Sequence, residues 1–182
     1  FLYELLSINH SGVPLQALAG LQQLRHLELA GVPLTTKDFD DVTEWPQNLE
    51  VLMLLRNSNV RNKHLQQIGA LQYLRCLSLA WCDDLSNDGM SHLSSLLNLE
   101  SLNISGTRVT ALGLRNLAPL EKLEELILCD CDVSDGEFRA VTNLKSLKSV
   151  RVSDNKINAP FSKEPMLALQ RRGVIVSSVE EE

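Results

Sequence analysis

The chain has few aromatic residues and contains no apolar run long enough to cross a membrane. Phe, Trp and Tyr make up 4% of its 182 residues, whereas all hydrophobic residues together make up 44%. A spanning helix needs about 20 consecutive apolar residues, and the first residues do not read as a secretory signal peptide. The sequence therefore predicts an aliphatic core and no membrane span.

Positive charge is also scarce. The chain has 17 lysines and arginines against 23 aspartates and glutamates, which gives a formal net charge of −6. Proteins that bind nucleic acid need clustered cations to neutralise phosphates and release counterions. The charge balance therefore argues against a nucleic-acid partner.

What the sequence does contain is a regular repeat of an apolar pair, L-x-L. The steps between successive pairs are 21, 25, 25, 25, 24, 24 and 24 residues, and the pairs begin at Leu6, Leu27, Leu52, Leu77, Leu102, Leu126, Val150 and Val174. Such a period predicts a solenoid, in which each unit contacts only its neighbours. We expect one array over residues 1–176, with a short first unit that continues upstream, and an acidic tail at 177–182.

Each unit combines a strand pattern with a helix pattern. In the unit that begins at Leu74, apolar residues alternate at Leu77 and Leu79 and then recur every three positions from Met90 to Leu96. The same helical positions hold Phe39, Val42 and Trp45; Leu65, Ile68 and Leu71; Leu114, Leu117 and Leu120; and Phe138, Val141 and Leu144. Polar residues suited to cap these helices precede them: Thr35, Asn62, Ser86, Thr110, Ser134 and Asn158.

These patterns predict an α/β solenoid that coils in a right-handed, curved path. We expect a parallel β-sheet on its concave face and helices on its convex face, because side chains alternate along a strand and parallel crossovers are right-handed. The repeat count gives about eight strand-bearing units.

The segment from Leu74 to Met90 reads L-R-C-L-S-L-A-W-C-D-D-L-S-N-D-G-M. It resembles the cysteine-containing branch of the leucine-rich repeat superfamily, whose consensus is L-x-x-L-x-L-x-x-C-x-x-L-T-D-x-G-L, and the run from Leu123 to Gly136 resembles it as well. Other units carry other residues at the cysteine position, so the array resembles a mixed subtype. The resemblance implies a binding role, since members of this branch include F-box substrate receptors of ubiquitin ligases, adaptors, receptors and scaffolds.

The cysteine position also has a physical explanation. Where the chain leaves the strand, backbone groups point inward and need a small side chain that can form hydrogen bonds. We therefore predict a structural ladder inside the solenoid. Its members are Asn57, Cys82, Thr107, Cys131 and Asn155.

The four cysteines do not fit a disulfide or a zinc site. Cys76 and Cys82 lie two units away from Cys129 and Cys131, which separates the pairs by about 10 Å in a parallel stack. Bridged Cα atoms lie within about 7 Å, and the spacings lack the C-x2-C pair that is usual in zinc sites. We expect reduced thiols, no metal, no cofactor and an intracellular, cytoplasmic location.

Function is expected on the side chains that the core does not use. Strand residues between the core leucines point to the concave face, and the loops that follow line its rim. The candidate partner-binding residues are His26, Glu28, Val51, Met53, Leu55, Arg56, Cys76, Trp81, Asn103, Glu125, Ile127 and Arg151.

Six of these candidates form what we call the central patch: Val51, Met53, Leu55, Arg56, Cys76 and Trp81. Apolar residues together with Trp, Met and Arg are typical of interface centres. The alternative is that Leu55 and Trp81 fold back and cover the edge of the core.

Acidic residues gather along the same rim: Asp83, Asp84, Asp130, Asp132, Asp135 and Glu137. Such a cluster attracts a partner with a basic surface. The alternative is that these are solvated residues of turns and helix starts, where acids are favoured.

A catalytic set is not evident. His26 and Glu28 share the concave face one strand step apart, but no nucleophile or enclosing pocket accompanies them. We therefore predict no catalytic residues and keep an enzyme only as a remote alternative.

The sequence predicts a non-catalytic recognition module or scaffold that binds a protein partner through its concave face and rim. The alternative is the substrate-receptor part of an F-box ubiquitin ligase. Apolar Tyr3, Leu6 and Ile8 begin the array without a polar cap, so we expect an upstream segment or a partner to cover that edge.

Overall fold

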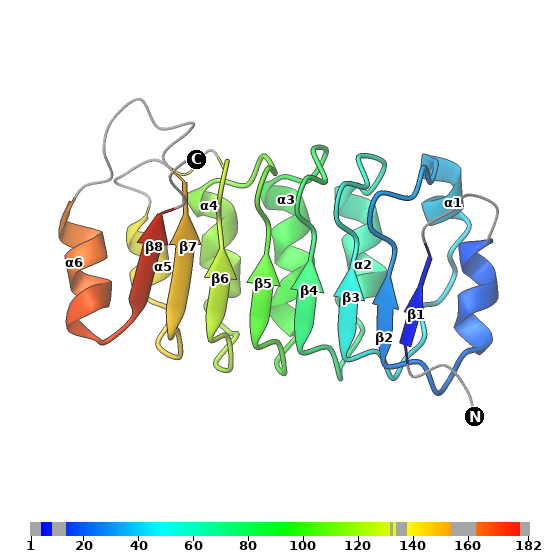
Figure 1. The fold of residues 1–182 in the computed structure, drawn as a ribbon, viewed down its shortest axis with the longest axis horizontal. Coiled ribbons are helices and arrows are strands. Elements are labelled where there is room, and N and C mark those ends of the chain that lie inside the picture. The colour runs from blue at the N-terminus through cyan, green and yellow to red at the C-terminus, as the bar shows by residue number, and fades with distance from the viewer. Residues whose placement is uncertain (1–4, 9–13, 132, 134–137, 154–162, 179–182) are drawn as a thin grey trace.

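The structure is a computed structural model that describes residues 5–8, 14–131, 133, 138–153 and 163–178. Eight strands form one parallel sheet, in which each strand lies beside its neighbours in sequence. The helices form a second layer behind this sheet (Figure 1). The predicted α/β solenoid with about eight strand-bearing units is confirmed.

The elements are short and regular. The strands are β1 (Leu5–Ser7), β2 (His26–Glu28), β3 (Val51–Met53), β4 (Cys76–Ser78), β5 (Ser101–Asn103), β6 (Glu125–Ile127), β7 (Ser149–Val152) and β8 (Ile175–Ser178). The α-helices are α1 (Thr36–Asp40), α2 (Leu65–Ile68), α3 (Asn87–Met90), α4 (Ala111–Leu114), α5 (Arg139–Thr142) and α6 (Lys163–Arg171). The 3₁₀ helices are η1 (Leu15–Gly20), η2 (Asn62–His64), η3 (Ser91–Ser95) and η4 (Arg115–Leu117).

The repeating apolar pair forms the core between the two layers. Leu27 of β2 pairs with Leu52 of β3, which in turn pairs with Leu77 of β4. From β2 to β7 the first apolar residue of each pair is at most 1% exposed. Residues on either side of it point the opposite way, to the sheet face that turns away from the helices, which is the predicted concave face.

The register of the last strand differs from the prediction. The repeat spacing made Val174 equivalent to Val150, but Val150 pairs with Val176. A shift of two residues leaves every side chain on the same face, so the alternating pattern alone did not reveal it. Val174 is buried just before the strand, and β8 continues to Ser178, beyond the predicted end of the array at residue 176.

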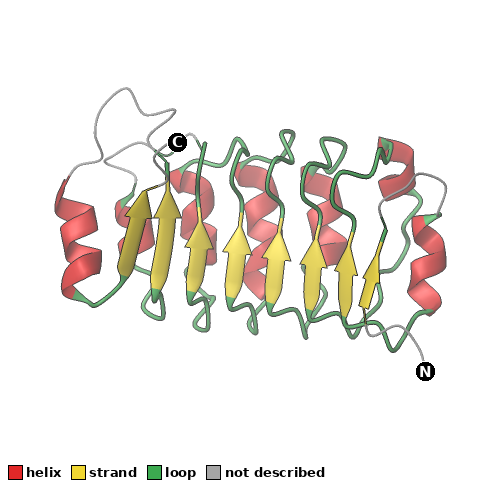
Figure 2. Cartoon of the chain, in the orientation of Figure 1, coloured by secondary structure: helices red, strands yellow, loops and turns green. Residues whose placement is uncertain are grey.

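The helices of the second layer are mostly short (Figure 2). α1 to α5 have four or five residues and α6 has nine, while α3 and α4 continue directly as the 3₁₀ helices η3 and η4. In the fourth unit, α3 passes directly into η3, and Met90, Leu93 and Leu96 are all 0% exposed. Their spacing of three residues matches the three residues per turn of a 3₁₀ helix. The predicted apolar stripe is therefore buried, although it belongs to a tighter helix than an α-helix.

Three of the predicted caps stand at the start of their helices, and one is wrong. Thr35 accepts the N–H of Asp38, and Thr110 accepts the N–H of Leu112. Ser86 is the N-cap residue of α3 but accepts no backbone N–H; its hydroxyl accepts the Nδ2 donor of Asn62 in the preceding unit at 2.8 Å. Asn62 is the first residue of η2 rather than its cap, and its amide joins two units. Ser134 and Asn158 lie outside the described residues.

Candidate protein-interaction site

The parallel register places the concave-face side chains in two rows that cross the sheet. The first row holds Leu5, His26, Val51, Cys76, Ser101, Glu125, Ser149 and Ile175. The second row holds Ser7, Glu28, Met53, Ser78, Asn103, Ile127, Arg151 and Ser177. The candidate residues predicted from sequence lie in these rows, except for Leu55, Arg56 and Trp81, which follow their strands on the rim.

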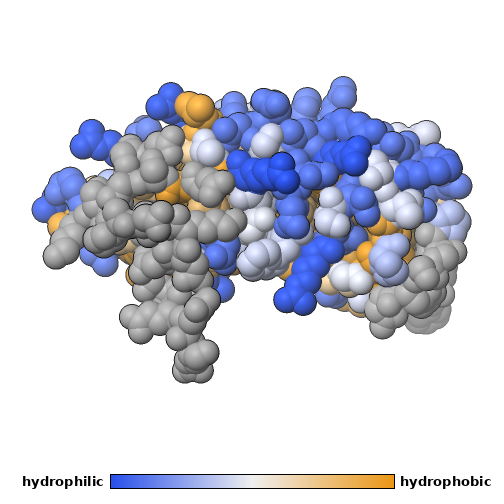
Figure 3. Space-filling view, turned by 90° about the horizontal axis from the view of Figure 1, so that it is seen from above, coloured by the Kyte–Doolittle hydropathy of each residue, from blue (hydrophilic) through white to orange (hydrophobic). Residues whose placement is uncertain are grey.

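The central patch is assembled from β3, β4 and the loops that follow them. Val51 pairs with Cys76 across the two strands. Val51, Met53 and Leu55 are half-buried, whereas Trp81 is 42% exposed. In the view from above, onto the rim where the strands end, hydrophobic residues show as small separate areas among hydrophilic ones (Figure 3). Trp81 is therefore the most accessible large apolar group of the central patch.

A row of left-handed backbone conformations runs along this rim. The position is the fourth residue after the first apolar residue of the strand. It holds Gly31 (φ 65°), Arg56 (φ 60°), Trp81 (φ 61°), Gly106 (φ 66°) and Asp130 (φ 55°). Each non-glycine residue there carries a cost of about 1 to 2 kcal/mol. Sequence reasoning missed this row, because its five residues (two glycines, an arginine, a tryptophan and an aspartate) share no chemistry.

Hydrogen bonds between units hold the row in place. The N–H of Arg56 donates to the carbonyl of Ala80 at 2.8 Å, and the N–H of Trp81 donates to the carbonyl of Ser105 at 2.7 Å. Each bond joins the left-handed residue of one unit to the rim of the next. The stacking of the solenoid therefore fixes the direction in which the Arg56 and Trp81 side chains leave the backbone.

The Trp81 indole is both packed and exposed. A Cβ atom added to Gly106 would lie 2.4 Å from Cε3 of Trp81, so the ring rests on the glycine backbone of the next unit. The alternative interpretation, that Trp81 folds back against the protein, therefore applies to one side of the ring. The other side accounts for its 42% exposure and stays available to a partner.

Some charged side chains of the concave face have a hydrogen-bond partner, whereas one has no described ion-pair partner. Glu125 accepts the hydroxyl of Ser101 at 2.7 Å, and Glu28 accepts the hydroxyl of Ser7 at 3.4 Å. Arg151 is exposed and forms no ion pair within the part of the chain that the structure describes.

The predicted acidic rim is partly neutralised. Asp84 lies between two arginines, 3.5 Å from Nε of Arg61 and 3.7 Å from a terminal nitrogen of Arg108. Asp83 is exposed and Asp130 is half-buried. Asp132, Asp135 and Glu137 lie outside the described residues.

The described members of the ladder are buried and bonded to backbone carbonyls. Asn57 donates from Nδ2 to Leu29 at 2.7 Å and to Leu54 at 3.1 Å. The thiol of Cys82 donates to the same Leu54 carbonyl at 3.2 Å, and burial raises the pKa of this thiol to about 12.

The second half of the ladder repeats this arrangement. Thr107 donates to the carbonyl of Ile104 at 2.7 Å, and the thiol of Cys131 donates to the same carbonyl at 3.1 Å. Asn155 lies outside the described residues. The bonds of Asn57 to Leu29, Cys82 to Leu54 and Cys131 to Ile104 each join the turns of neighbouring units.

Sequence reasoning also missed a histidine site in the helical layer. His64 is 7% exposed and stacks on Phe39 with ring centroids 5.6 Å apart. Its Nδ1 accepts the N–H of Arg61 at 2.9 Å, so Nε2 carries the proton and donates to Asp40 at 2.7 Å. Hydrogen bonds from His64 and Lys63 lower the pKa of Asp40 to about 2. The spacing of 24 residues between Asp40 and His64 is the one signal that places them in adjacent units.

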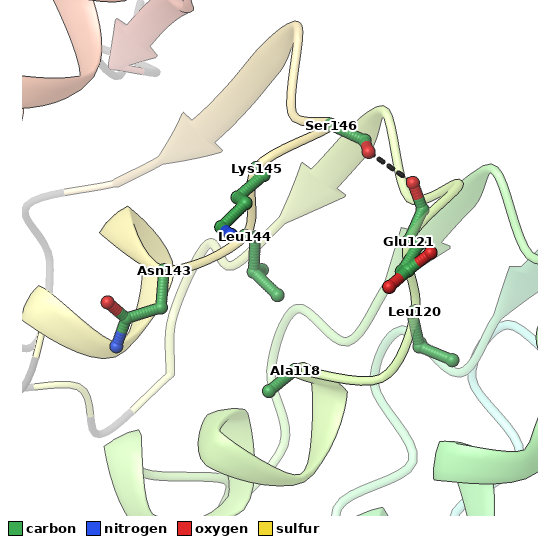
Figure 4. A pocket seen from close by; sticks show the side chains of 7 residues that line it. All are labelled: Ala118, Leu120, Glu121, Asn143, Leu144, Lys145 and Ser146. Carbon is green, nitrogen blue, oxygen red and sulfur yellow. Dashed lines mark hydrogen bonds between the residues drawn. The ribbon is translucent and has the colours of Figure 1, made fainter.

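Among the described residues, no group of three His, Cys, Asp or Glu residues is close enough to hold a metal ion. A pocket lies where the segment that follows η4 meets the segment that follows α5 in the next unit (Figure 4). There the hydroxyl of Ser146 donates to the carbonyl of Glu121, and Lys145 and Asn143 line the opening. Within the described ranges, none of the helices has the length and hydrophobicity to cross a bilayer.

Comparisons with known proteins agree with this geometry. Residues 70–94 and 95–118, which form two consecutive units, match the family model described as leucine-rich repeat. The chain contains leucine-rich repeats. It is also similar to a Trypanosoma equiperdum protein named "Putative adenylate cyclase regulatory protein", with 31% identity over 139 residues. The match covers 76% of the chain and 21% of that protein.

Among solved structures, the leucine-rich repeat array is similar to a plant peptide hormone receptor, RGFR1, solved in complex with RGF2. The TM-score is 0.52 at 19% identity, and the match covers 79% of the chain and 23% of the receptor chain. At this identity the likeness concerns the fold. The chain thus spans less than a quarter of the length of each of these two relatives.

Proposed function

We propose that this leucine-rich repeat protein is a non-catalytic recognition module that binds a protein partner through its concave face and rim, with the central patch at the centre of contact. The observation that carries the proposal is Trp81. Its backbone is held in a left-handed conformation, one side of its ring is supported by Gly106, and 42% of the residue is exposed. Strain of this kind is retained where the surrounding structure fixes it, and it concentrates at functional sites.

The surroundings of Trp81 support the same proposal. Met53, Cys76 and Leu55 provide half-buried apolar area beside it, and Trp and Arg are enriched among residues that dominate binding energy. The stacked units hold these side chains in fixed positions, so little conformational entropy is lost on docking. The plant receptor with this fold was solved with RGF2 bound, which is consistent with a peptide or protein partner here.

The alternatives from the sequence stay as hypotheses. A role as the substrate receptor of an F-box ubiquitin ligase is compatible with a leucine-rich repeat array and has no specific support among the described residues. An intracellular location, a basic partner attracted by Asp83 and Asp130, and a segment or partner that covers β1 are further hypotheses of the same kind.

Affinity capture from native extract tests the proposed function. We compare the parent chain with a variant that combines Met53→Glu and Trp81→Ala, and we expect the variant to lose specific partners while keeping its circular dichroism spectrum. Tyr73→Ala combined with Leu97→Glu is the matched control, because both residues are exposed away from the central patch. An unchanged partner set with the folded Met53→Glu, Trp81→Ala variant would show that the central patch is not the contact site. Ubiquitin-ligase subunits among the lost partners would favour the F-box alternative.

A further inference from the structure

Arg56 and Trp81 occupy the same rim position in adjacent units. Both have left-handed backbones, with φ of 60° and 61°. The N–H of Arg56 donates to the carbonyl of Ala80, the residue immediately before Trp81, at 2.8 Å. Neighbouring strands of a sheet lie about 4.8 Å apart, so one ligand can contact both side chains.

The guanidinium of Arg56 is exposed and has no ion-pair partner among the described carboxylates. Its neighbours on the rim differ, because Arg61 and Arg108 both contact Asp84. A second exposed cation without a described ion-pair partner, Arg151, lies on the same face.

The carboxylates of the concave face each have a hydrogen-bond donor beside them. Glu28 accepts a hydrogen bond from Ser7 at 3.4 Å, and Glu125 accepts one from Ser101 at 2.7 Å. A serine hydroxyl does not remove the charge of a carboxylate, so the preference of the central patch is set by the group nearest to Trp81. That group is the exposed guanidinium of Arg56, whose charge favours an acidic side chain in a ligand that contacts it.

From this arrangement we infer that the central patch binds an acidic peptide segment of a partner protein. In that segment an Asp or Glu side chain lies next to an apolar side chain. The carboxylate binds Arg56, and the apolar side chain packs on the exposed side of the Trp81 indole and on Met53. The inference rests on the proposed function and adds the chemistry of the partner. It differs from the hypothesis that the acidic rim attracts a partner with a basic surface.

Three physical features support this assignment. Guanidinium and carboxylate form charge-assisted, often bidentate hydrogen bonds, which are the stronger kind. The indole supplies a large contact area with few rotatable bonds. The left-handed backbone and the Gly106 support hold the Trp81 ring in place before binding, which lowers the ordering cost.

The test uses three fluorescein-labelled peptide pools with a central Asp-Phe, Asn-Phe or Lys-Phe pair and flanks randomised among Ser, Thr, Gly and Ala. Fluorescence anisotropy is measured with the full chain. We expect the parent to bind the Asp-Phe pool about tenfold or more tightly than the Asn-Phe pool. This ratio should fall with added salt.

Variants at Arg56 assign the preference to its guanidinium. Arg56→Asn removes the charge and keeps a residue that tolerates the left-handed conformation, so we expect the ratio to fall to about one without unfolding. Arg56→Lys keeps the charge but not the bidentate geometry, so it should give an intermediate ratio. Arg115→Asn is the matched control, because Arg115 is exposed in η4 of the helical layer and should leave the ratio unchanged.

Four results would overturn the inference: equal binding of the Asp-Phe and Asn-Phe pools, tighter binding of the Lys-Phe pool, no binding of any pool, or an unchanged ratio with Arg56→Asn. Each of them leaves the proposed function intact if native partners are still lost with the Met53→Glu, Trp81→Ala variant. Retention of those native partners would instead count against the proposed contact site.

Discussion

The indole of Trp81 rests on the backbone of Gly106 in the next unit, at a distance that leaves no room for a Cβ atom. The contact links two consecutive left-handed rim positions. Glycine at residue 106 therefore has two effects. It adopts a positive φ without steric cost, and its lack of a Cβ atom leaves space for the Trp81 ring to pack on the backbone.

Gly106→Ala should damage both the backbone and the ring position. The φ of 66° imposes strain on alanine, and the added Cβ would lie 2.4 Å from Cε3 of Trp81. We expect the free energy of unfolding to fall by about 2 to 4 kcal/mol, from the left-handed conformation and overpacking together. Urea unfolding measures this loss. Quenching by acrylamide should increase, because the displaced Trp81 gains exposure while Trp45 stays buried.

Gly31→Ala is the control for the backbone effect alone. Gly31 has nearly the same φ, 65°, and an added Cβ there would meet no atom within 4 Å. We expect a loss of about 1 to 2 kcal/mol with no change in acrylamide quenching. Equal effects of the two substitutions on both measurements would contradict the packing of the Trp81 ring on Gly106.

Asn57→Ala should destabilise the array more than the removal of an exposed asparagine. The Nδ2 of Asn57 donates hydrogen bonds to the carbonyls of Leu29 and Leu54 inside the turn. Its removal leaves these buried acceptors with fewer donors. We expect a loss of about 2 to 3 kcal/mol in the free energy of unfolding, measured with urea. Asn143→Ala, at an exposed residue, should stay within about 0.5 kcal/mol of the parent.

The fold could be predicted because its signal is local and repeated. Leucines two residues apart, recurring at nearly constant steps, fix both the strand and the face that is buried, and Leu27, Leu52 and Leu77 stack as this pattern requires. The concave side chains follow by alternation. The sequence alone missed the position of Val176, because a slip of two residues preserves the alternation.

The site was only partly predictable because its decisive features arise between units. Nothing in the identities of Arg56 and Trp81 indicates a left-handed backbone, which glycine normally adopts. The bidentate bond from Arg75 to Glu100, at 2.8 and 2.9 Å, likewise depends on which residues the stacking brings side by side. Such contacts follow from the repeat register only after the exact length of each unit is known.

The thiols should separate into two reactivity groups. Cys76 and Cys129 are half-buried on the concave side, whereas Cys82 and Cys131 are buried. Burial raises the pKa of Cys76, of Cys129 and, to about 12, of Cys82. At pH 8 in native buffer we expect a thiol-specific disulfide reagent to label Cys76 and Cys129 slowly and Cys82 not at all, because the thiolate is the reacting form.

The control for this labelling experiment is the double variant Cys76→Ser, Cys129→Ser. It should show almost no reaction while folded and two reactive thiols after unfolding in urea. Rapid native labelling of Cys82, located by peptide mapping, would contradict the buried ladder position.

The Asp40–His64 pair predicts a stability change at low pH. The ordinary pKa of this carboxyl is 3.8, and hydrogen bonds from His64 and Lys63 lower it to about 2 in the folded chain. A carboxyl whose folded-state pKa is depressed stabilises the fold at pH values above its unfolded pKa, and this contribution is lost as the pH falls through the folded value. We therefore expect the difference in Tm between the parent and Asp40→Ala to be constant above about pH 5 and to shrink between about pH 4 and pH 2.

Asp88→Ala separates this effect from general acid denaturation. Asp88 is exposed in the first turn of α3 and forms no ion pair with any residue in the described ranges, so its difference in Tm from the parent should show a weaker dependence on pH. The parent and both variants lose stability together as other carboxylates are protonated, and only the Asp40→Ala curve should converge on the parent curve. A Tm difference for Asp40→Ala that persists at pH 2 would mean that the side chain stabilises α1 through packing rather than through its charge.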